Sequence, residues 1–196
     1  MKPEAMIRYF FNKIVMSLLF LSLMIVSAQE CRAQAGYWHI ELQGGYELFH
    51  DMSNKSGYDL GLGCRYGINE RFYGAFMLHG GINNGHYEGI YAGEKTKLDH
   101  TMREYMIGLG PGMYLYNGGN SWIFADILLG YGFGEELKSA EESTRKSLDG
   151  FASAARIGVD FQISNGLILG LNTGAYLVGG EVRPVVNVKV GMLLNL

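Results

Sequence analysis

Residues 121–134 have the sequence SWIFADILLGYGFG, and this stretch decides the fold class. Apolar side chains stand at every second position from Ile123 to Phe133, and the opposite face holds Asp126 and the glycines at positions 130, 132 and 134. A period of two is that of a β-strand, whose successive side chains point to opposite faces. The stretch therefore predicts a strand with one apolar face and one face of small or polar residues.

The same alternation recurs along the chain, so eight strands are expected. The expected strands are Tyr37–Leu48, Gly57–Ile68, Arg71–Gly81, Thr101–Tyr116, Ser121–Gly134, Leu148–Ile163, Leu167–Leu177 and Arg183–Leu196. The connectors alternate in length: tight turns at 69–70, 117–120 and 164–166, longer polar segments at 49–56, 82–100 and 135–147, and a shorter one at 178–182. Short turns at one end and longer loops at the other are typical of an outer-membrane barrel.

The composition excludes several other classes of protein. Of 196 residues, 29 are glycine and only 3 are proline, and aromatic residues make up 13%. So many aromatic residues exclude a disordered chain, and so few prolines exclude collagen. Residues 36–196 hold 12 Lys and Arg against 17 Asp and Glu, a net charge of −5 without a basic patch. We therefore expect no nucleic-acid partner.

The first 35 residues have the features of a secretory signal peptide. Lys2, Arg8 and Lys13 precede an apolar run at 14–26, which is too short for a membrane-spanning helix. Small-residue patterns allow cleavage after Ala28 or after Ala35. We favour the second, which predicts a signal peptide at 1–35 and a barrel domain at 36–196. That domain would hold Cys64 alone, so no intrachain disulfide is expected.

Aromatic residues near the strand ends predict two interfacial girdles. One girdle would hold Trp38, Tyr66, Phe72, Tyr116, Trp122 and Phe161, and the other Tyr46, Phe49, Tyr58, Tyr105, Tyr131, Phe133, Phe151 and Tyr176. A soluble sandwich or lipocalin-like barrel would also alternate. The polar face, however, carries many glycines. Strand surfaces that face water seldom use glycine, whereas the crowded interior of a small barrel needs small residues. The glycines therefore favour a membrane barrel over a soluble one.

With these patterns the chain resembles the small outer-membrane β-barrel proteins of Gram-negative bacteria, the OmpX- and OmpA-type eight-stranded family. The resemblance covers residues 36–196. Its most specific part is the C-terminal pattern of Lys189, Gly191, Leu194 and Leu196, where the family commonly ends in Phe. It implies an all-β protein, an eight-stranded antiparallel up-and-down transmembrane β-barrel. It also implies an outer-membrane location, contact with lipid and lipopolysaccharide, and insertion by the barrel-insertion machinery.

Charged residues on the polar face would lie inside such a barrel. They are Glu41, Asp59, Arg65, Glu104, Asp126, Arg156, Asp160 and Lys189. Buried charges are costly unless paired, and eight strands leave an interior just wide enough for side chains to fill. We therefore expect a salt-bridged plug, with a narrow hydrophilic pore as the alternative.

The sequence offers little support for a metal, cofactor or catalytic site. The five histidines lack ligand spacing, and the acidic residues at 135, 136, 141 and 142 lack the order of a calcium loop. The glycine-rich run at 108–112 fails the dinucleotide pattern. Some similar barrels modify lipid A, yet no paired nucleophile and base is evident here. We expect a non-enzymatic structural or surface-interaction protein, with a small-solute channel as the second hypothesis.

Overall fold

The computed structural model describes residues 36–50, 52, 54–91, 94–139, 144–164 and 166–195. The expected signal peptide at 1–35 and the terminal Leu196 lie outside the described residues. Within the described part of the chain, no helix has the length and hydropathy needed to cross a membrane.

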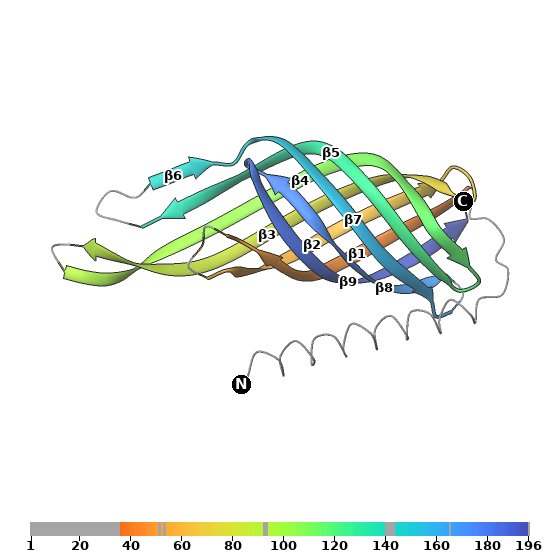
Figure 1. The fold of residues 1–196 in the computed structure, drawn as a ribbon, viewed down its shortest axis with the longest axis horizontal. Coiled ribbons are helices and arrows are strands. Elements are labelled where there is room, and N and C mark those ends of the chain that lie inside the picture. The colour runs from red at the N-terminus through yellow and green to blue at the C-terminus, as the bar shows by residue number, and fades with distance from the viewer. Residues whose placement is uncertain are drawn as a thin grey trace, which may run out of the picture.

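The described chain forms antiparallel strands almost throughout. They are β1 (Tyr37–Leu48), β2 (Ser56–Gly67), β3 (Phe72–Tyr91), β4 (Glu94–Gly118), β5 (Ser121–Lys138), β6 (Thr144–Ser147), β7 (Gly150–Gln162), β8 (Leu167–Val178) and β9 (Glu181–Asn195). Eight of them follow one another around a ring in the order β4-β3-β2-β1-β9-β8-β7-β5, which the pairing of β4 with β5 closes (Figure 1). The predicted eight-stranded antiparallel barrel is thus confirmed.

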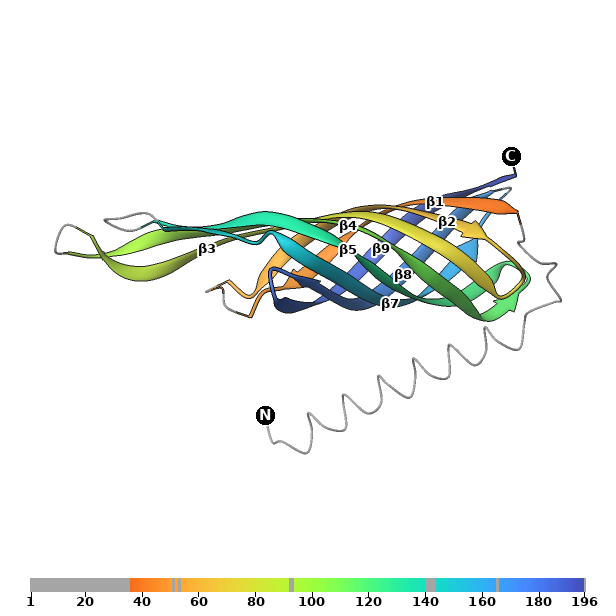
Figure 2. The same cartoon turned by 90° about the horizontal axis from the view of Figure 1, so that it is seen from above.

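Part of the sheet extends well beyond the barrel. Strands β3 and β4 are 20 and 25 residues long, and with β5 and β6 they project from one end, as Figure 2 shows. Their pairing continues from Asn83↔Met102 out to Tyr91↔Glu94. We call residues 83–103 and 134–147 the extension. The prediction of polar loops at 82–100 and 135–147 was wrong over most of their length, because strands can form there without an apolar face.

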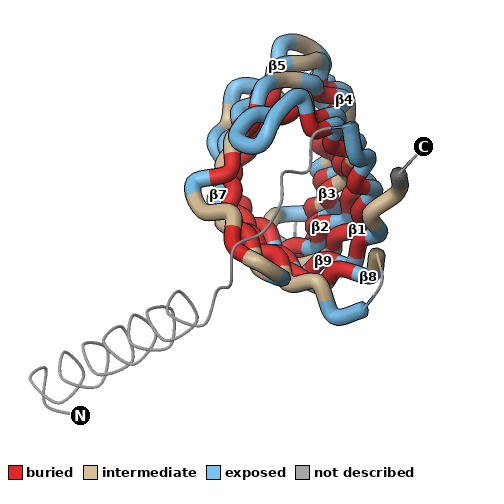
Figure 3. The backbone as a smooth tube through the Cα atoms, turned by 90° about the vertical axis from the view of Figure 1, so that its right-hand side faces the viewer, coloured by how far each residue is buried: buried red, intermediate tan, exposed pale blue. Residues whose placement is uncertain are grey.

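The outer wall of the barrel is apolar. Large side chains such as Tyr58, Leu109 and Val186 are 70%, 68% and 61% exposed. Figure 3 looks along the long axis of the barrel, and buried and exposed residues alternate along the strands of the closed wall. A soluble protein rarely exposes so large a continuous apolar surface. The wall matches the apolar band by which an outer-membrane barrel meets lipid.

Three residues predicted for the aromatic girdles point inward instead. Trp122, Phe49 and Tyr176 are 2%, 1% and 0% exposed. They fill the barrel, and glycines on neighbouring strands make room for such large groups. A Cβ on Gly112 would overlap the ring of Tyr73, for example. Strand parity was the available signal, because Trp122 has the parity of Asp126 and Tyr176 has that of Asn172.

Candidate functional site

All eight charged residues predicted for the polar face lie inside the barrel. Each of them is at most 4% exposed: Glu41, Asp59, Arg65, Glu104, Asp126, Arg156, Asp160 and Lys189. They gather in groups along the barrel axis, and Arg156 Nη1, 3.5 Å from Glu41 Oε1, links two of these groups. Each group includes residues from strands that are far apart in sequence. The alternation could therefore predict that these residues lie inside, but not which of them form ion pairs.

The first group is the Arg65 cluster, which comprises Glu41, Arg65, Asp160 and Lys189. The Arg65 guanidinium lies 2.5 Å from Glu41 and 2.7 Å from Asp160. The Lys189 ammonium lies 3.0 Å and 2.8 Å from the same two carboxylates. Two cations therefore face two anions, with the Phe124 ring 4.3 Å from the Arg65 guanidinium carbon and 3.8 Å from Lys189 Nζ. Such mutual pairing offsets the cost of burying four charges.

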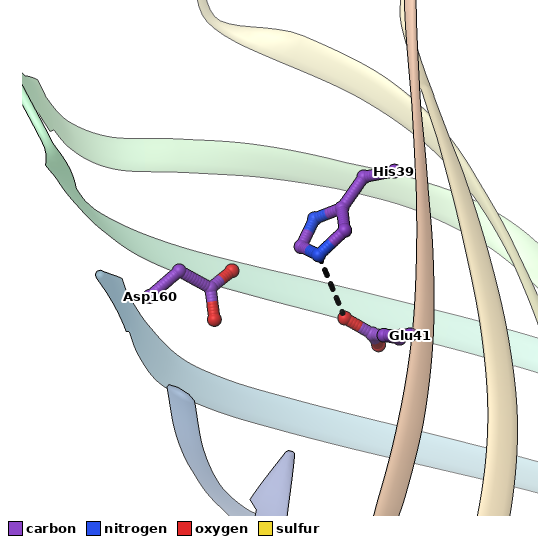
Figure 4. Close-up of side chains that lie close together, drawn as sticks. All are labelled: His39, Glu41 and Asp160. Carbon is purple, nitrogen blue, oxygen red and sulfur yellow. Dashed lines mark ion pairs between the residues drawn. The ribbon is translucent and has the colours of Figure 1, made fainter. Parts of the chain in front are cut away.

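His39 stands beside this cluster without joining it closely. Its Nε2 lies 3.9 Å from Glu41, and Figure 4 shows the Glu41 and Asp160 carboxylates turned toward the imidazole ring from different strands. Both carboxylates already contact Arg65 and Lys189. The position of His39 thus follows from packing at the edge of a cluster whose charges are matched.

The second group is the Arg156 cluster of Gln43, Asp126, Arg156 and Asn172. Arg156 donates two parallel hydrogen bonds of 2.9 Å to Asp126, the bidentate geometry that a guanidinium and a carboxylate prefer. Its remaining nitrogen donates to Gln43 Oε1 at 3.2 Å, and Asn172 donates to the same oxygen at 2.9 Å. These contacts cross the barrel from wall to wall, so side chains occupy its middle.

The third group is the His79 cluster of Glu47, Asp59, His79 and Glu104. His79 Nδ1 lies 2.8 Å from Asp59 Oδ1, and Arg183 forms an ion pair with Glu104. Sequence reasoning did not include Glu47, His79 and Arg183 among the interior charges, although all are at most 4% exposed. Strand parity was the available signal, since Arg183 and Lys189 are an even number of residues apart on β9.

Buried apolar side chains lie in the interior at both ends of the barrel. Phe49, Met52, Met102 and Leu148 form one buried set, which we call the lid, at the end that carries the extension. The opposite end is filled by Tyr73, Tyr114, Trp122 and Ile168, which we call the floor. Each of these eight residues is at most 6% exposed. The three charged clusters therefore lie between two apolar layers.

The extension carries a smaller ionic group outside the barrel. His100, predicted to be solvated in a loop, is instead 3% exposed on β4 and lies 2.8 Å from Glu136. Lys138 lies 2.8 Å from the same carboxylate. Burial opposes ionisation of Glu136, but the hydrogen bonds from Lys138 and His100 outweigh it and hold its pKa below the ordinary value of 4.5. His100 was missed because the predicted strand began at Thr101, whereas β4 begins at Glu94.

The C-terminal pattern lies on β9, beside β1 where the barrel closes. Lys189 belongs to the Arg65 cluster, and a Cβ on Gly191 would overlap the His39 ring. Leu194 is half-buried opposite Trp38, and Leu196 lies outside the described residues. The polar and glycine positions of the pattern thus also serve the packing of the interior.

Comparison with solved structures finds the same fold at low sequence identity. Ail, the attachment invasion locus protein of Yersinia pestis, in complex with the heparin analogue sucrose octasulfate, has a TM-score of 0.58 and 15% identity, over 82% of this chain and 99% of that chain. OprG from Pseudomonas aeruginosa has a TM-score of 0.60 and 14% identity, over 84% and 98%. Neisserial surface protein A has a TM-score of 0.56 and 10% identity, over 81% and 97%.

The family follows from a match between the sequence and a family model, although no curated protein matches the chain in sequence. The family model of the outer membrane protein beta-barrel domain, however, matches residues 16–191, most of the chain. With the closed antiparallel ring and the apolar outer wall, this match places the protein in the outer membrane of a Gram-negative bacterium. The chain belongs to the outer membrane protein beta-barrel domain family.

Proposed function

We propose that the protein is a closed, non-conducting barrel that holds the extension at the cell surface for interaction with external partners. The observation that carries the proposal is the filled interior: three charged clusters between the lid and the floor, with contacts that cross the barrel. A strand pair that continues far past the apolar wall supports the second half of the proposal. Binding surfaces are commonly loops or strands mounted on a rigid scaffold.

Conductance in a planar bilayer separates this proposal from a channel. Protein folded in detergent and shown to be inserted is expected to give no discrete current steps. Steps whose size changes in Glu104→Gln or Arg156→Gln would instead identify a pore lined by the interior charges. A channel of known conductance, inserted under the same conditions, serves as the positive control.

Surface display of the extension has its own test. In a Cys64→Ala background, Lys97→Cys places a thiol in the extension and Asn69→Cys places one in a tight turn at the opposite end of the barrel. A membrane-impermeant maleimide added to intact cells is expected to label the first variant and not the second. Labelling of Asn69→Cys alone would show that the barrel has the opposite orientation and that the extension does not lie at the cell surface.

The proposal also excludes catalysis. Its support is that, among the described residues, the imidazoles of His79, His86 and His100 hydrogen-bond to the carboxylates of Asp59, Asp99 and Glu136, and no hydrogen bond joins an imidazole to a serine hydroxyl that it could activate. Release of fatty acid from lipid A by the purified protein would contradict this part of the proposal.

We further propose that the barrel-insertion machinery recognises the C-terminal pattern. The position of that pattern on β9, the strand that pairs with β1 to close the ring, supports this. Leu194→Ala combined with Leu196→Ala is expected to reduce the folded protein recovered from outer membranes while leaving refolding from urea into detergent unchanged. An equal loss in both settings would show that the residues act only on stability.

A further inference from the structure

The His79 cluster contains an arrangement that charge pairing does not explain. Glu47 of β1, His79 of β3 and Glu104 of β4 each offer one ligand atom, and these atoms lie within 4.8 Å of one another. His79 Nε2 is 3.6 Å from Glu47 Oε2 and 3.5 Å from Glu104 Oε1. All three side chains are fully buried, at 0% exposure.

Hydrogen bonding does not satisfy these atoms. Separations of 3.5 and 3.6 Å are too long for an N–H···O bond. Both Glu47 oxygens, Glu104 Oε1 and His79 Nε2 are buried without a hydrogen-bond partner, whereas Glu104 Oε2 pairs with Arg183. A buried carboxylate with no donor is costly, so a group that accepts electron pairs from all three residues would relieve a large desolvation penalty.

A hydrogen bond at Nδ1 fixes the orientation of the His79 ring. Its Nδ1 lies 2.8 Å from Asp59 Oδ1, and Asn187 donates to the other oxygen of Asp59 at 2.5 Å. A proton on Nδ1 that bonds to Asp59 leaves the Nε2 lone pair of the neutral ring directed toward Glu47 and Glu104. This is the arrangement by which a carboxylate orients a metal-bound histidine.

The Glu47 carboxylate can lie close to the backbone of β3 because residue 81 is glycine. A Cβ at Gly81 would overlap Glu47 Oε2 and would lie 3.0 Å from Glu104 Cγ. The missing side chain therefore allows the Glu47 carboxylate to lie beside His79 and Glu104. A methyl group at this position would displace that carboxylate from the other two ligands.

The charges and distances select the kind of ion. Glu47, Asp59 and Glu104 carry three negative charges when ionised, and the one neighbouring cation, Arg183, pairs with both Glu104 and Glu181. The carboxylates therefore outnumber the cation, and a divalent ion would offset this excess of negative charge. Ligand atoms bound tetrahedrally at about 2.1 Å lie about 3.4 Å apart, close to the separations seen here. A nitrogen and two carboxylate oxygens suit zinc or a similar transition metal better than Mg²⁺.

The geometry points to a binding site for one divalent transition-metal ion, held by Glu47, His79 and Glu104 beneath the lid. Asp59 acts as a positioning residue through His79. The ion would join β1, β3 and β4 from the inside, next to the end from which the extension projects. Its role is therefore structural, and it departs from the sequence expectation of no metal site, because the three ligands come from separate strands and have no local spacing.

The Arg65 cluster provides a matched comparison within the same barrel. His39, Glu41 and Asp160 also lie within ligand distance of one another (Figure 4). There, Arg65 and Lys189 already supply the positive charge, at 2.5–3.0 Å from the carboxylates. We therefore expect no ion at His39, and His39→Gln is the control for His79→Gln.

The first experiment measures bound metal directly. The full folded chain, stripped with a chelator, refolded in detergent with Zn²⁺ and passed through gel filtration, is expected to retain about one zinc per chain. His79→Gln and Gly81→Ala should lose it, and His39→Gln should keep it. Absence of zinc from folded wild-type protein, or equal loss in both histidine variants, would overturn the proposal.

Cobalt gives a second readout that needs no ligand variant to fold. Wild-type protein loaded with Co²⁺ is expected to show the intense visible absorption of a tetrahedral site, resistant to excess Mg²⁺ and bleached by Zn²⁺. Asp59→Asn should weaken zinc binding about 10–100-fold, the usual cost of losing an orienting carboxylate. A weak octahedral spectrum, or displacement by Mg²⁺, would count against a site of this geometry.

Discussion

At the scale of single residues, the interior is held together by charges that face more than one partner. Arg65 is the clearest case, since it bridges Glu41 and Asp160 from strands on different sides of the barrel. Arg65→Ala would leave two buried carboxylates with Lys189 as their remaining cation in this cluster. We expect the variant to lose about 3–5 kcal/mol of unfolding free energy, measured by urea titration of protein folded in micelles.

The control for this prediction is Arg71→Ala, which removes an exposed arginine near the start of β3. Its unfolding free energy should stay within about 0.5 kcal/mol of wild type, as is usual for surface substitutions. If both variants unfolded at the wild-type midpoint, the Arg65 cluster would not contribute to stability as its geometry indicates.

Glycines in the wall make a second prediction at this scale. A Cβ on Gly130 would overlap the carbonyl oxygen of Ile107 on the neighbouring strand, whereas a Cβ on Gly74 would meet nothing within 4 Å. Gly130→Ala is therefore expected to destabilise the barrel by about 1–3 kcal/mol, the usual cost of overpacking. Gly74→Ala should not. Equal urea midpoints for the two variants would show that the wall can absorb the added methyl group.

Residue-scale reasoning from the sequence succeeded where parity alone was needed. It placed Glu41, Arg65 and Asp160 on one face, and the structure brings them into contact. It could not pair Arg65 with Asp160, because 95 residues separate them and the contact depends on closure of the ring. It assigned Trp122 to a girdle because the residue lies near a strand end, although its parity is that of Asp126 and the structure buries it inside.

At the scale of elements, the extension shows where the alternating signal ends. Inside the membrane, lipid on one face and a packed interior on the other force apolar and polar residues to alternate. Beyond Ile82 both faces of β3 lose that contrast, so Asn83, Asn84 and Gly85 give no strand pattern although they pair with β4. The strands were predicted well within the wall, and their continuation could be found only from the structure.

The ionic group of the extension predicts a dependence on pH. Glu136 faces His100, Lys138 and Lys146, and its pKa is lowered from 4.5. A carboxyl whose folded pKa is depressed stabilises the structure above its unfolded pKa, and this contribution is lost as pH falls through the folded pKa. Hydrogen exchange in the extension should therefore remain slow near neutral pH and accelerate, after correction for intrinsic rates, below about pH 4.

Glu136→Gln tests the assignment of this effect. The variant should exchange faster than wild type at neutral pH and should lose most of the acid-dependent change. An unchanged acid response in Glu136→Gln would assign the pH dependence to another group of the extension.

At the scale of the whole molecule, two structures with different requirements share the same strands. The barrel satisfies the membrane through an apolar wall and a filled interior, and the ring closes through β4 with β5 and through β1 with β9. The extension needs neither lipid nor ring closure, since β3, β4, β5 and β6 pair there as an open sheet. The lid lies between the barrel interior and the extension, so the extension can be altered without exposing the interior.

This division predicts that the barrel tolerates a shortened extension. Gly85 pairs with His100, so replacing residues 86–99 by Asn-Gly joins the two strands through a two-residue turn in the same register. The lid, the three charged clusters and the contact between His100 and Glu136 all lie outside the deleted segment. We expect the unfolding free energy of the barrel to change by less than about 1 kcal/mol, because closure entropy varies slowly with loop length. Urea titration and the heat-dependent gel shift of the folded barrel measure this directly. Failure to fold would mean that the long hairpin of β3 and β4 is needed to form the ring, and the extension would then be part of the folding unit rather than a surface mounted on it.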